Sequence, residues 1–212
     1  IAYLTDQLLG WYPLHHRDLP WRETNDPYII WLSEIILQQT RVAQGLPYFQ
    51  LFLNRFPDVF SLAKASEEEV MRCWQGLGYY SRARNLHQCA KDIVSTYSGK
   101  FPDNYNGLLR LKGVGNYTAA AIASFAFKER VAVLDGNVFR VLSRYFGNTK
   151  DISTTVGKKV FQELANQVVP DHSSDIYNQA IMEFGALQCV PKNPSCGTCP
   201  MALHCVAFQN KM

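Results

Sequence analysis

The sequence has 212 residues, of which 47% are hydrophobic, so it is long enough for one large domain or two small ones and too apolar to stay disordered. It contains no run of about eighteen apolar residues, which excludes a membrane-spanning helix. The formal net charge of +3 is too small to indicate a nucleic-acid partner, because the distribution of basic residues matters more than their sum.

Helical periodicity runs through almost the whole chain, and strand-like alternation is scarce. Asn25-Asp26-Pro27 is a typical helix start with Asp26 as the cap, and Ser66 followed by Glu69 fits a capping box. Glycine and proline residues separate the periodic segments. We therefore expect an all-α fold. The expected helices cover about 28–43, 47–56, 67–76, 81–97, 104–110, 116–126, 137–146, 157–168 and 174–187.

A Gly-x-Gly turn at Gly113 and Gly115 joins two of these helices and resembles a helix-hairpin-helix motif. Glycines let a backbone turn tightly and approach a partner closely. The free N–H groups at the start of the following helix can bind a phosphate, which positions DNA without reading its sequence. An ordinary corner between two helices is the alternative interpretation.

Four of the six cysteines crowd into residues 189–205, whereas Cys73 and Cys89 stand alone. The spacing is Cys189-x6-Cys196-x2-Cys199-x5-Cys205. Clustering of this kind favours a metal site over a disulfide framework, and four thiolates suit zinc or an iron–sulfur cluster. Zinc or two disulfides remain alternatives. Lys192, inside the first cysteine loop, is expected either to meet a phosphate or to be solvated.

Two carboxyl groups stand in positions that suit acid–base chemistry. Asp135 follows an apolar run and opens the next helix, where it is a typical N-cap and where the helix terminus favours its ionised form. Glu34 lies in a helix that is apolar on nearly every side. Burial raises the pKa of a carboxyl group, which keeps a proton available near neutral pH. The alternative for Glu34 is an ordinary helical glutamate satisfied by Gln38 or by water.

Together with the cysteine spacing, three further stretches resemble the MutY family of adenine DNA glycosylases, within the endonuclease III superfamily. They are Leu19-Pro-Trp21, Leu37-Gln-Gln-Thr40 and Gly76-Leu-Gly-Tyr-Tyr-Ser-Arg-Ala-Arg-Asn-Leu86, and the resemblance covers about residues 10–207. It implies a two-lobed helix-hairpin-helix glycosylase fold. A six-helix barrel module would take residues 19–134, and residues 1–18 with 135–212 would form an iron–sulfur domain. The resemblance also implies that a structural 4Fe–4S cluster is bound by Cys189, Cys196, Cys199 and Cys205.

The same resemblance implies that adenine mispaired with 8-oxoguanine or guanine is flipped out of DNA and its N-glycosidic bond cut. Glu34 would protonate the base at N7, and Asp135 would stabilise the positive charge that develops on the sugar, facing the same nucleotide from the other lobe. Bifunctional relatives carry a lysine at the position of Tyr117. A phenol cannot form an imine with the sugar, so the enzyme should be monofunctional. Tyr117 would shield the sugar or pack the hairpin.

Contacts with double-stranded DNA are implied for further residues. Gln39 would enter the base stack, and Tyr79 would wedge beside the opposing 8-oxoguanine. Arg82 and Arg84 would hold phosphates, or else form a solvated helix face. The weaker candidates for the adenine pocket are Arg17, Trp21, Arg22 and Gln179. A monomer with no membrane association is expected, in a bacterial cytoplasm rather than a eukaryotic nucleus.

One departure from the family bears on substrate choice. MutY proteins continue past the cluster into a domain that recognises 8-oxoguanine, whereas this sequence stops at Met212. We expect the catalytic part alone, with weaker discrimination between 8-oxoguanine and guanine. The rival interpretations are a thymine glycosylase acting on G·T mismatches, a bifunctional lyase of the endonuclease III type, and a non-catalytic DNA-binding module that carries a cluster.

Overall fold

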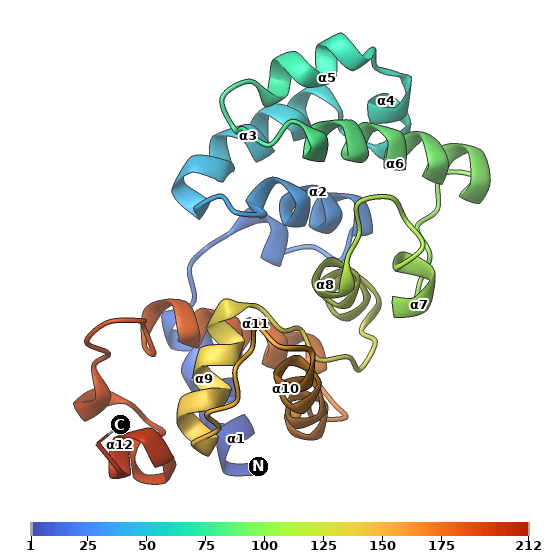
Figure 1. Ribbon diagram of the computed structural model, residues 1–212. Coiled ribbons are helices and arrows are strands. Elements are labelled where there is room, and N and C mark those ends of the chain that lie inside the picture. The colour runs from blue at the N-terminus through green and yellow to red at the C-terminus, as the bar shows by residue number, and fades with distance from the viewer. Residues whose placement is uncertain (1, 212) are drawn as a thin grey trace. The chain divides into compact units, whose positions relative to one another are not determined.

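Helices joined by short loops make up residues 2–211, which the computed structural model describes (Figure 1). No strand occurs among these residues, so the predicted all-α fold is confirmed. The chain divides into two units, one formed by Leu19–Phe127 and the other by the residues up to Asp18 together with those from Lys128 onward. None of the described helices is long and apolar enough to cross a membrane.

The unit Leu19–Phe127 is built around α2, an eleven-residue helix over Pro27–Leu37. Its side chains Ile30, Trp31, Leu32 and Ile36 are almost completely buried, because α3 and α8 pack against it, while α4 and α5 pack against α6. The other elements are η1 (Pro20–Arg22), α3 (Val42–Arg55), α4 (Val59–Lys64), α5 (Glu67–Trp74), α6 (Ser81–Tyr97), α7 (Tyr105–Leu108) and α8 (Asn116–Phe127).

Local signals set several helix starts in this unit. Asp26 caps α2 by accepting a hydrogen bond from the backbone N–H of Tyr28 at 2.8 Å. The capping box of α5 is formed in both directions between Ser66 and Glu69. Both caps are confirmed, because a short polar side chain next to the helix start satisfies donors that the helix itself leaves open.

The expected helix 28–43 is wrong in its length. The helix α2 ends at Leu37, and α3 begins only at Val42. Between them Gln39 adopts a left-handed backbone conformation with φ of 55°, which no continuous helix contains. The signal for the break is not local, because the carbonyl groups at the end of α2 are bound by Arg82, on α6.

The second unit packs α11 against both α1 and α9, with α12 against α9 and α10 alongside. Its core includes Leu4, Leu8, Phe161, Tyr177 and Phe184, each at most 1% exposed. The elements are α1 (Ala2–His15), α9 (Gly136–Phe146), α10 (Thr155–Val168), α11 (Ser174–Leu187), η2 (Cys196–Thr198), η3 (Ala202–His204) and α12 (Val206–Gln209).

Residues 128–134 group with the second unit, whereas the sequence places them with the first. The side chain of Asn178, on α11, accepts a hydrogen bond from the N–H of Val133 at 3.2 Å and donates one to the carbonyl of Val131 at 2.8 Å. Lys128 is ion-paired with Asp175 on the same helix. These bonds connect residues 128–134 to α11, and no local sequence pattern in that segment predicts them.

Candidate active site and cluster loop

Glu34 is carried by α2 and is only 9% exposed. The apolar residues that surround it in the sequence are buried by α3 and α8, so the carboxyl group is held largely away from bulk water. The helix end is also tied to α8, because Gln38 donates a hydrogen bond from Nε2 to Oγ1 of Thr118 at 3.4 Å. The sequence-based expectation of a poorly solvated glutamate agrees with this burial.

The hairpin between α7 and α8 turns at Gly113, whose φ is +77°. A Cβ atom placed there would lie 3.1 Å from Cβ of Asn85, whereas one on Gly115 would meet nothing within 4 Å. Leu111 and Val114 anchor the turn in the core, and the residues between and after them are exposed. Tyr117 is half-buried in the first turn of α8. The hairpin therefore presents exposed backbone at a helix start, as a phosphate contact requires.

Gly113→Ala is expected to lower the free energy of unfolding by about 1–2 kcal/mol, because an L-residue is disfavoured in the left-handed region and Asn85 crowds the added methyl group. Gly10 is the matched control, since it is exposed within α1 and has open space around its Cβ position. Gly10→Ala is expected to stabilise by about 0.5–1 kcal/mol. Denaturant unfolding of both variants checks the prediction, and two changes of the same sign would contradict it.

Gln39 and Tyr79 both have left-handed backbone conformations, with φ of 55° and 47°, and both side chains are exposed. Arg84 is exposed on α6. The terminal nitrogens of Arg82 instead donate to backbone carbonyl groups within the protein, whereas the sequence suggests that they contact a phosphate. Trp21, on η1, is 9% exposed and packs edge-on against Phe49, and Arg22 next to it is half-buried.

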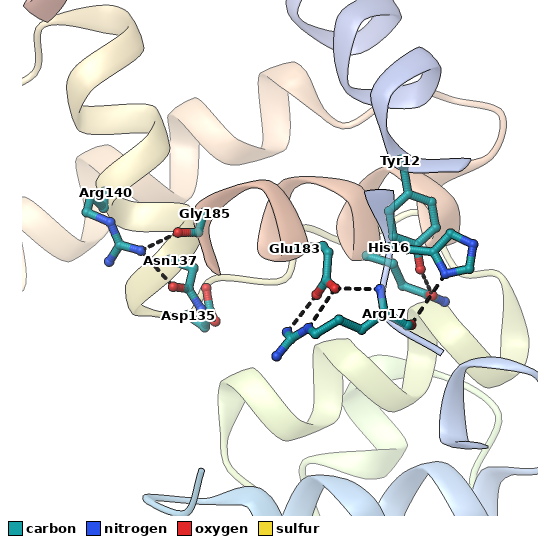
Figure 2. Close-up of polar contacts among 9 residues, drawn as sticks. Tyr12, His16, Arg17, Asp135, Asn137, Arg140, Glu183 and Gly185 are labelled. Carbon is teal, nitrogen blue, oxygen red and sulfur yellow. Dashed lines mark hydrogen bonds and ion pairs between the residues drawn. The ribbon is translucent and has the colours of Figure 1, made fainter. Parts of the chain in front are cut away.

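Asp135 belongs to the other unit and caps α9 (Figure 2). Its Oδ1 accepts from the backbone N–H of Val138 at 2.8 Å, and its Oδ2 accepts from Nδ2 of Asn137 at 2.8 Å. Burial raises the pKa of Asp135 above its ordinary value, and the hydrogen bonds to Val138 and Asn137 together with the charge of Arg140 oppose that rise. The net direction is opposite to the one expected from the helix terminus alone, because desolvation of the carboxylate is the larger effect.

Two residues that the sequence did not single out hold Asp135 in place. Arg140 donates from Nη2 to Oδ1 of Asn137 and to the carbonyl oxygen of Gly185, both at 2.7 Å (Figure 2). Its Nε also donates to the carbonyl oxygen of Cys189 at 2.8 Å. A series of hydrogen bonds therefore runs from the carbonyl group of Cys189 through Arg140 and Asn137 to the carboxylate of Asp135. Helical spacing puts Asn137 and Arg140 on one face, but only the packed α11 reveals their partners.

Arg17 and Gln179 lie in this same unit. The guanidinium of Arg17 forms a two-point ion pair with Glu183, which is completely buried, and the backbone N–H of Arg17 bonds to the same carboxylate (Figure 2). Gln179 accepts a hydrogen bond from the hydroxyl of Tyr12 at 2.7 Å. Glu183 was missed by sequence reasoning, because a buried glutamate on α11 resembles any other helical glutamate until its partner is known.

The four clustered cysteines line one cavity of about 280 Å³. All four are unpaired thiols, so the alternative of two disulfides is not supported. Within residues 2–211 no group of His, Cys, Asp and Glu is close enough together to hold a single metal ion. Nη1 of Arg144 donates a hydrogen bond to Sγ of Cys189 at 3.4 Å.

The other two cysteines show no sign of a site. Burial raises the pKa of Cys89 to about 12. It also raises the pKa of Cys73. Both residues lie in the unit Leu19–Phe127, and neither lines the cavity that the four clustered cysteines share, so both are best explained as part of the packing.

The all-helical fold and the glycine hairpin are those of the helix-hairpin-helix class of proteins. The chain belongs to the HhH-GPD superfamily of base excision DNA repair proteins, whose family model matches residues 32–168. Its curated relatives include adenine DNA glycosylases. That of Buchnera aphidicola subsp. Schizaphis graminum is 40% identical over 99% of this chain, and that of Homo sapiens is 42% identical over 95%.

The chain spans 61% of the length of the Buchnera relative and 39% of the human one. Among solved structures, a thermostable thymine-DNA glycosylase matches with a TM-score of 0.91 and 30% identity, covering 99% of this chain and 96% of that one. A non-covalent endonuclease III–DNA complex matches with a TM-score of 0.83, covering 100% of this chain and 96% of that one. At 21% identity, the second likeness shows the fold alone.

Proposed function

We propose that this chain is the catalytic part of a monofunctional adenine DNA glycosylase acting on adenine mispaired with 8-oxoguanine or guanine in double-stranded DNA. The observation that carries the proposal is the pair of carboxyl groups, Glu34 nearly buried on α2 and Asp135 held by hydrogen bonds at the start of α9. The likeness to adenine DNA glycosylases over nearly the whole chain supports adenine as the base.

The reaction divides between the two carboxyl groups. Glu34 transfers its proton to N7 of adenine, so the base leaves neutral when the bond between the sugar and the base breaks. The electron pair of that bond goes to the base, and the sugar becomes an oxocarbenium-like cation beside the carboxylate of Asp135. Water then adds to the sugar carbon and loses a proton. The product is an intact strand with an abasic site.

Other residues bind and open the duplex. Backbone N–H groups at the start of α8, following Gly113 and Gly115, would bind a phosphate, and Arg84 would bind another. Gln39 would enter the base stack and Tyr79 would wedge beside the opposing 8-oxoguanine, which offsets the cost of extruding the adenine. The candidates for contacts with the adenine itself are Arg17, Trp21, Arg22 and Gln179.

We further propose that Cys189, Cys196, Cys199 and Cys205 hold a structural 4Fe–4S cluster. The donor set of four unpaired thiols at one cavity supports it, and Arg144 donates a hydrogen bond to Sγ of Cys189 at that cavity. When bound, the cluster supplies a cross-link for the C-terminal loop rather than hydrolytic chemistry. Because the carbonyl of Cys189 is bonded to Arg140, an ordered cysteine loop would also steady the support of Asp135.

Cys199→Ser is expected to reduce iron and inorganic sulfide in the purified protein strongly, because it removes one of four ligands and serine is a poor donor for iron–sulfur clusters. Visible absorption should fall in parallel. Cys73→Ser is the matched control and should leave the metal and sulfide content unchanged, since Cys73 stands apart in the other unit. Stoichiometric zinc without sulfide in the unmodified chain would contradict the cluster.

Asn137→Ala is expected to move the acid side of the pH–rate profile to higher pH. The change removes a hydrogen bond that lowers the pKa of Asp135, so the pKa rises further. The carboxylate acts only when ionised, and its ionised fraction then falls at a higher pH as the solution is acidified. Single-turnover rates measured across pH check this, and an unchanged acid limb would refute the proposed support.

The test of the function is a glycosylase assay on four duplexes, carrying 8-oxoG·A, G·A, G·T and thymine glycol. Release of adenine from the first two, with nothing from the others, is the expected result. A thymine glycosylase is the second candidate, favoured by the thermostable thymine-DNA glycosylase at 30% identity. Release of thymine from G·T without release of adenine would establish that candidate instead.

The same assay tests whether the enzyme is monofunctional. With Tyr117 in place of a lysine, the strand should stay intact until alkali is added, and borohydride should trap no covalent complex. Spontaneous nicking or a trapped complex would show that another amine attacks the sugar, and would support a lyase.

A further inference from the structure

One arginine binds the carbonyl groups of two turns that lie far apart in the sequence. Nη1 of Arg82 donates to the carbonyl oxygens of Ile35 and Ile36, each at 3.2 Å, and to that of Gln38. Nη2 donates, at longer range, to the carbonyl oxygens of Leu77 and Gly78, at 3.4 and 3.5 Å. The first set closes the C-terminal end of α2, and the second belongs to the turn before α6.

Each of these turns carries a non-glycine residue in a left-handed conformation directly after a bound carbonyl. Gln39 follows Gln38 with φ of 55°, and Tyr79 follows Gly78 with φ of 47°. Side chains disfavour this region, and such conformations persist only where the surroundings fix them. The hydrogen bonds from Arg82 to the carbonyl groups of Gln38 and Gly78 fix the backbone directly before Gln39 and Tyr79.

Two aromatic rings contact the guanidinium of Arg82. Its central carbon lies 5.0 Å from the ring centre of Trp74 and 5.7 Å from that of Tyr79. Nε1 of Trp74 donates to the carbonyl of Gly78 at 2.9 Å, which fixes the same peptide a second time. Only arginine combines a flat cation for two aromatic rings with enough donors for several carbonyl groups.

The two residues that Arg82 orients are exposed, and Tyr79 is 66% exposed despite its large aromatic ring. A strained backbone that presents an uncovered ring is a costly arrangement for stability alone and is typical of a contact surface. We propose that Arg82 is a positioning residue that joins Gln39 and Tyr79 into one preassembled element for opening DNA. This inference rests on the proposed function, and it assigns Arg82 a role without any phosphate contact.

The test is a double-mutant cycle on affinity, measured with a duplex in which a 2′-fluorinated adenosine, resistant to cleavage, faces 8-oxoguanine. Arg82→Lys keeps the charge but loses the fork of donors, and is expected to weaken binding by about 10-fold. In a background carrying both Gln39→Ala and Tyr79→Ala, the same change should cost less than about 2-fold, because nothing remains to be positioned. Arg72→Lys, on the exposed arginine of α5, is the control and should not alter binding.

A merely structural role would lower the melting temperature and weaken binding equally in both backgrounds, which would overturn the proposal. A second cycle leaves Arg82 intact and therefore does not depend on how well its variant folds. Gln39→Ala and Tyr79→Ala are made singly and together, and one shared element predicts that the pair loses less affinity than the product of the single losses. Independent, multiplying losses would contradict it.

Failure of the proposed function is recognised separately. If the unmodified chain shows no preference for the duplex with adenine opposite 8-oxoguanine, the choice of substrate is wrong. Both cycles are then measured on the duplex that the glycosylase assay identifies, where the same non-additivity is expected. Additive losses on that duplex would reject the role of Arg82 whatever the base.

Discussion

Glu34→Gln is expected to reduce the single-turnover rate of adenine release by about 10²–10⁴-fold, the usual contribution of a general acid. Glutamine has nearly the same shape and fits the buried position on α2, but it has no acidic proton to give to N7. The base would have to leave as an anion. Affinity for the mispaired duplex should stay within a few-fold of the unmodified chain, because the change leaves the residues proposed to contact DNA in place.

A matched control separates acid catalysis from a general effect of removing a carboxyl group. Glu67 is exposed in the first turn of α5, in the same unit, and Glu67→Gln should leave the rate unchanged. A rate for Glu34→Gln within a few-fold of the unmodified chain would mean that the proton comes from elsewhere. Loss of binding together with excision would point to a structural role for Glu34.

Asp135→Asn is expected to lower the rate by about 10²–10³-fold, the loss typical of removing one electrostatic stabiliser of the transition state. An amide cannot offset positive charge on the sugar. Its oxygen can still accept from the N–H of Val138, so the start of α9 should persist, but its NH2 group cannot accept from Nδ2 of Asn137, so the fold should lose about 1 kcal/mol of stability. The rate and the melting temperature of the same preparation check both halves of the prediction.

The loss of rate caused by Asp135→Asn should depend on pH. For Asp135→Asn the loss should be largest at neutral and higher pH, where the carboxylate is ionised in the unmodified chain, and should shrink as acid protonates it. The raised pKa of Asp135 places that convergence at a higher pH than for an ordinary aspartate. A loss independent of pH down to the acid limit of stability would indicate that its charge is not what matters.

Local chemistry made much of the fold predictable. The cap at Asp26, the box at Ser66 and the N-cap at Asp135 each depend on residues within three positions, so sequence alone located them. The glycine turn at Gly113 was equally visible, because its backbone conformation requires a residue without a side chain. The cysteine spacing predicted four thiols at one place, and all four line a single cavity.

What escaped prediction depends on partners distant in the chain. The helix α2 stops at Leu37 because its last carbonyl groups bind Arg82, more than forty residues further on. Asn137 and Arg140 support Asp135 only because α11 brings Gly185 and Cys189 beside α9. A Cβ atom on Gly185 would lie 2.7 Å from Cβ of Asn137, so glycine permits that close packing, and its sequence context gives no hint of it.

The pKa of Asp135 is raised, whereas its position at a helix start predicts a lowered pKa. A helix N-terminus and two hydrogen bonds favour the carboxylate, and a reading of the sequence includes only these effects. Burial acts in the opposite direction and is larger, but it is fixed by how α9 and α11 pack. Asn137 and Arg140 limit the rise in the pKa of Asp135, which is the support that the proposed function requires.

The most direct measurement compares two duplexes in single-turnover reactions of the unmodified chain, one with adenine and one with 7-deazaadenine opposite 8-oxoguanine. The analogue has a C–H group where adenine has N7, so it can enter the same site but cannot accept a proton there. The account predicts that adenine is released with the strand intact, while 7-deazaadenine is bound with similar affinity and stays attached. Equal release of the two bases would contradict it.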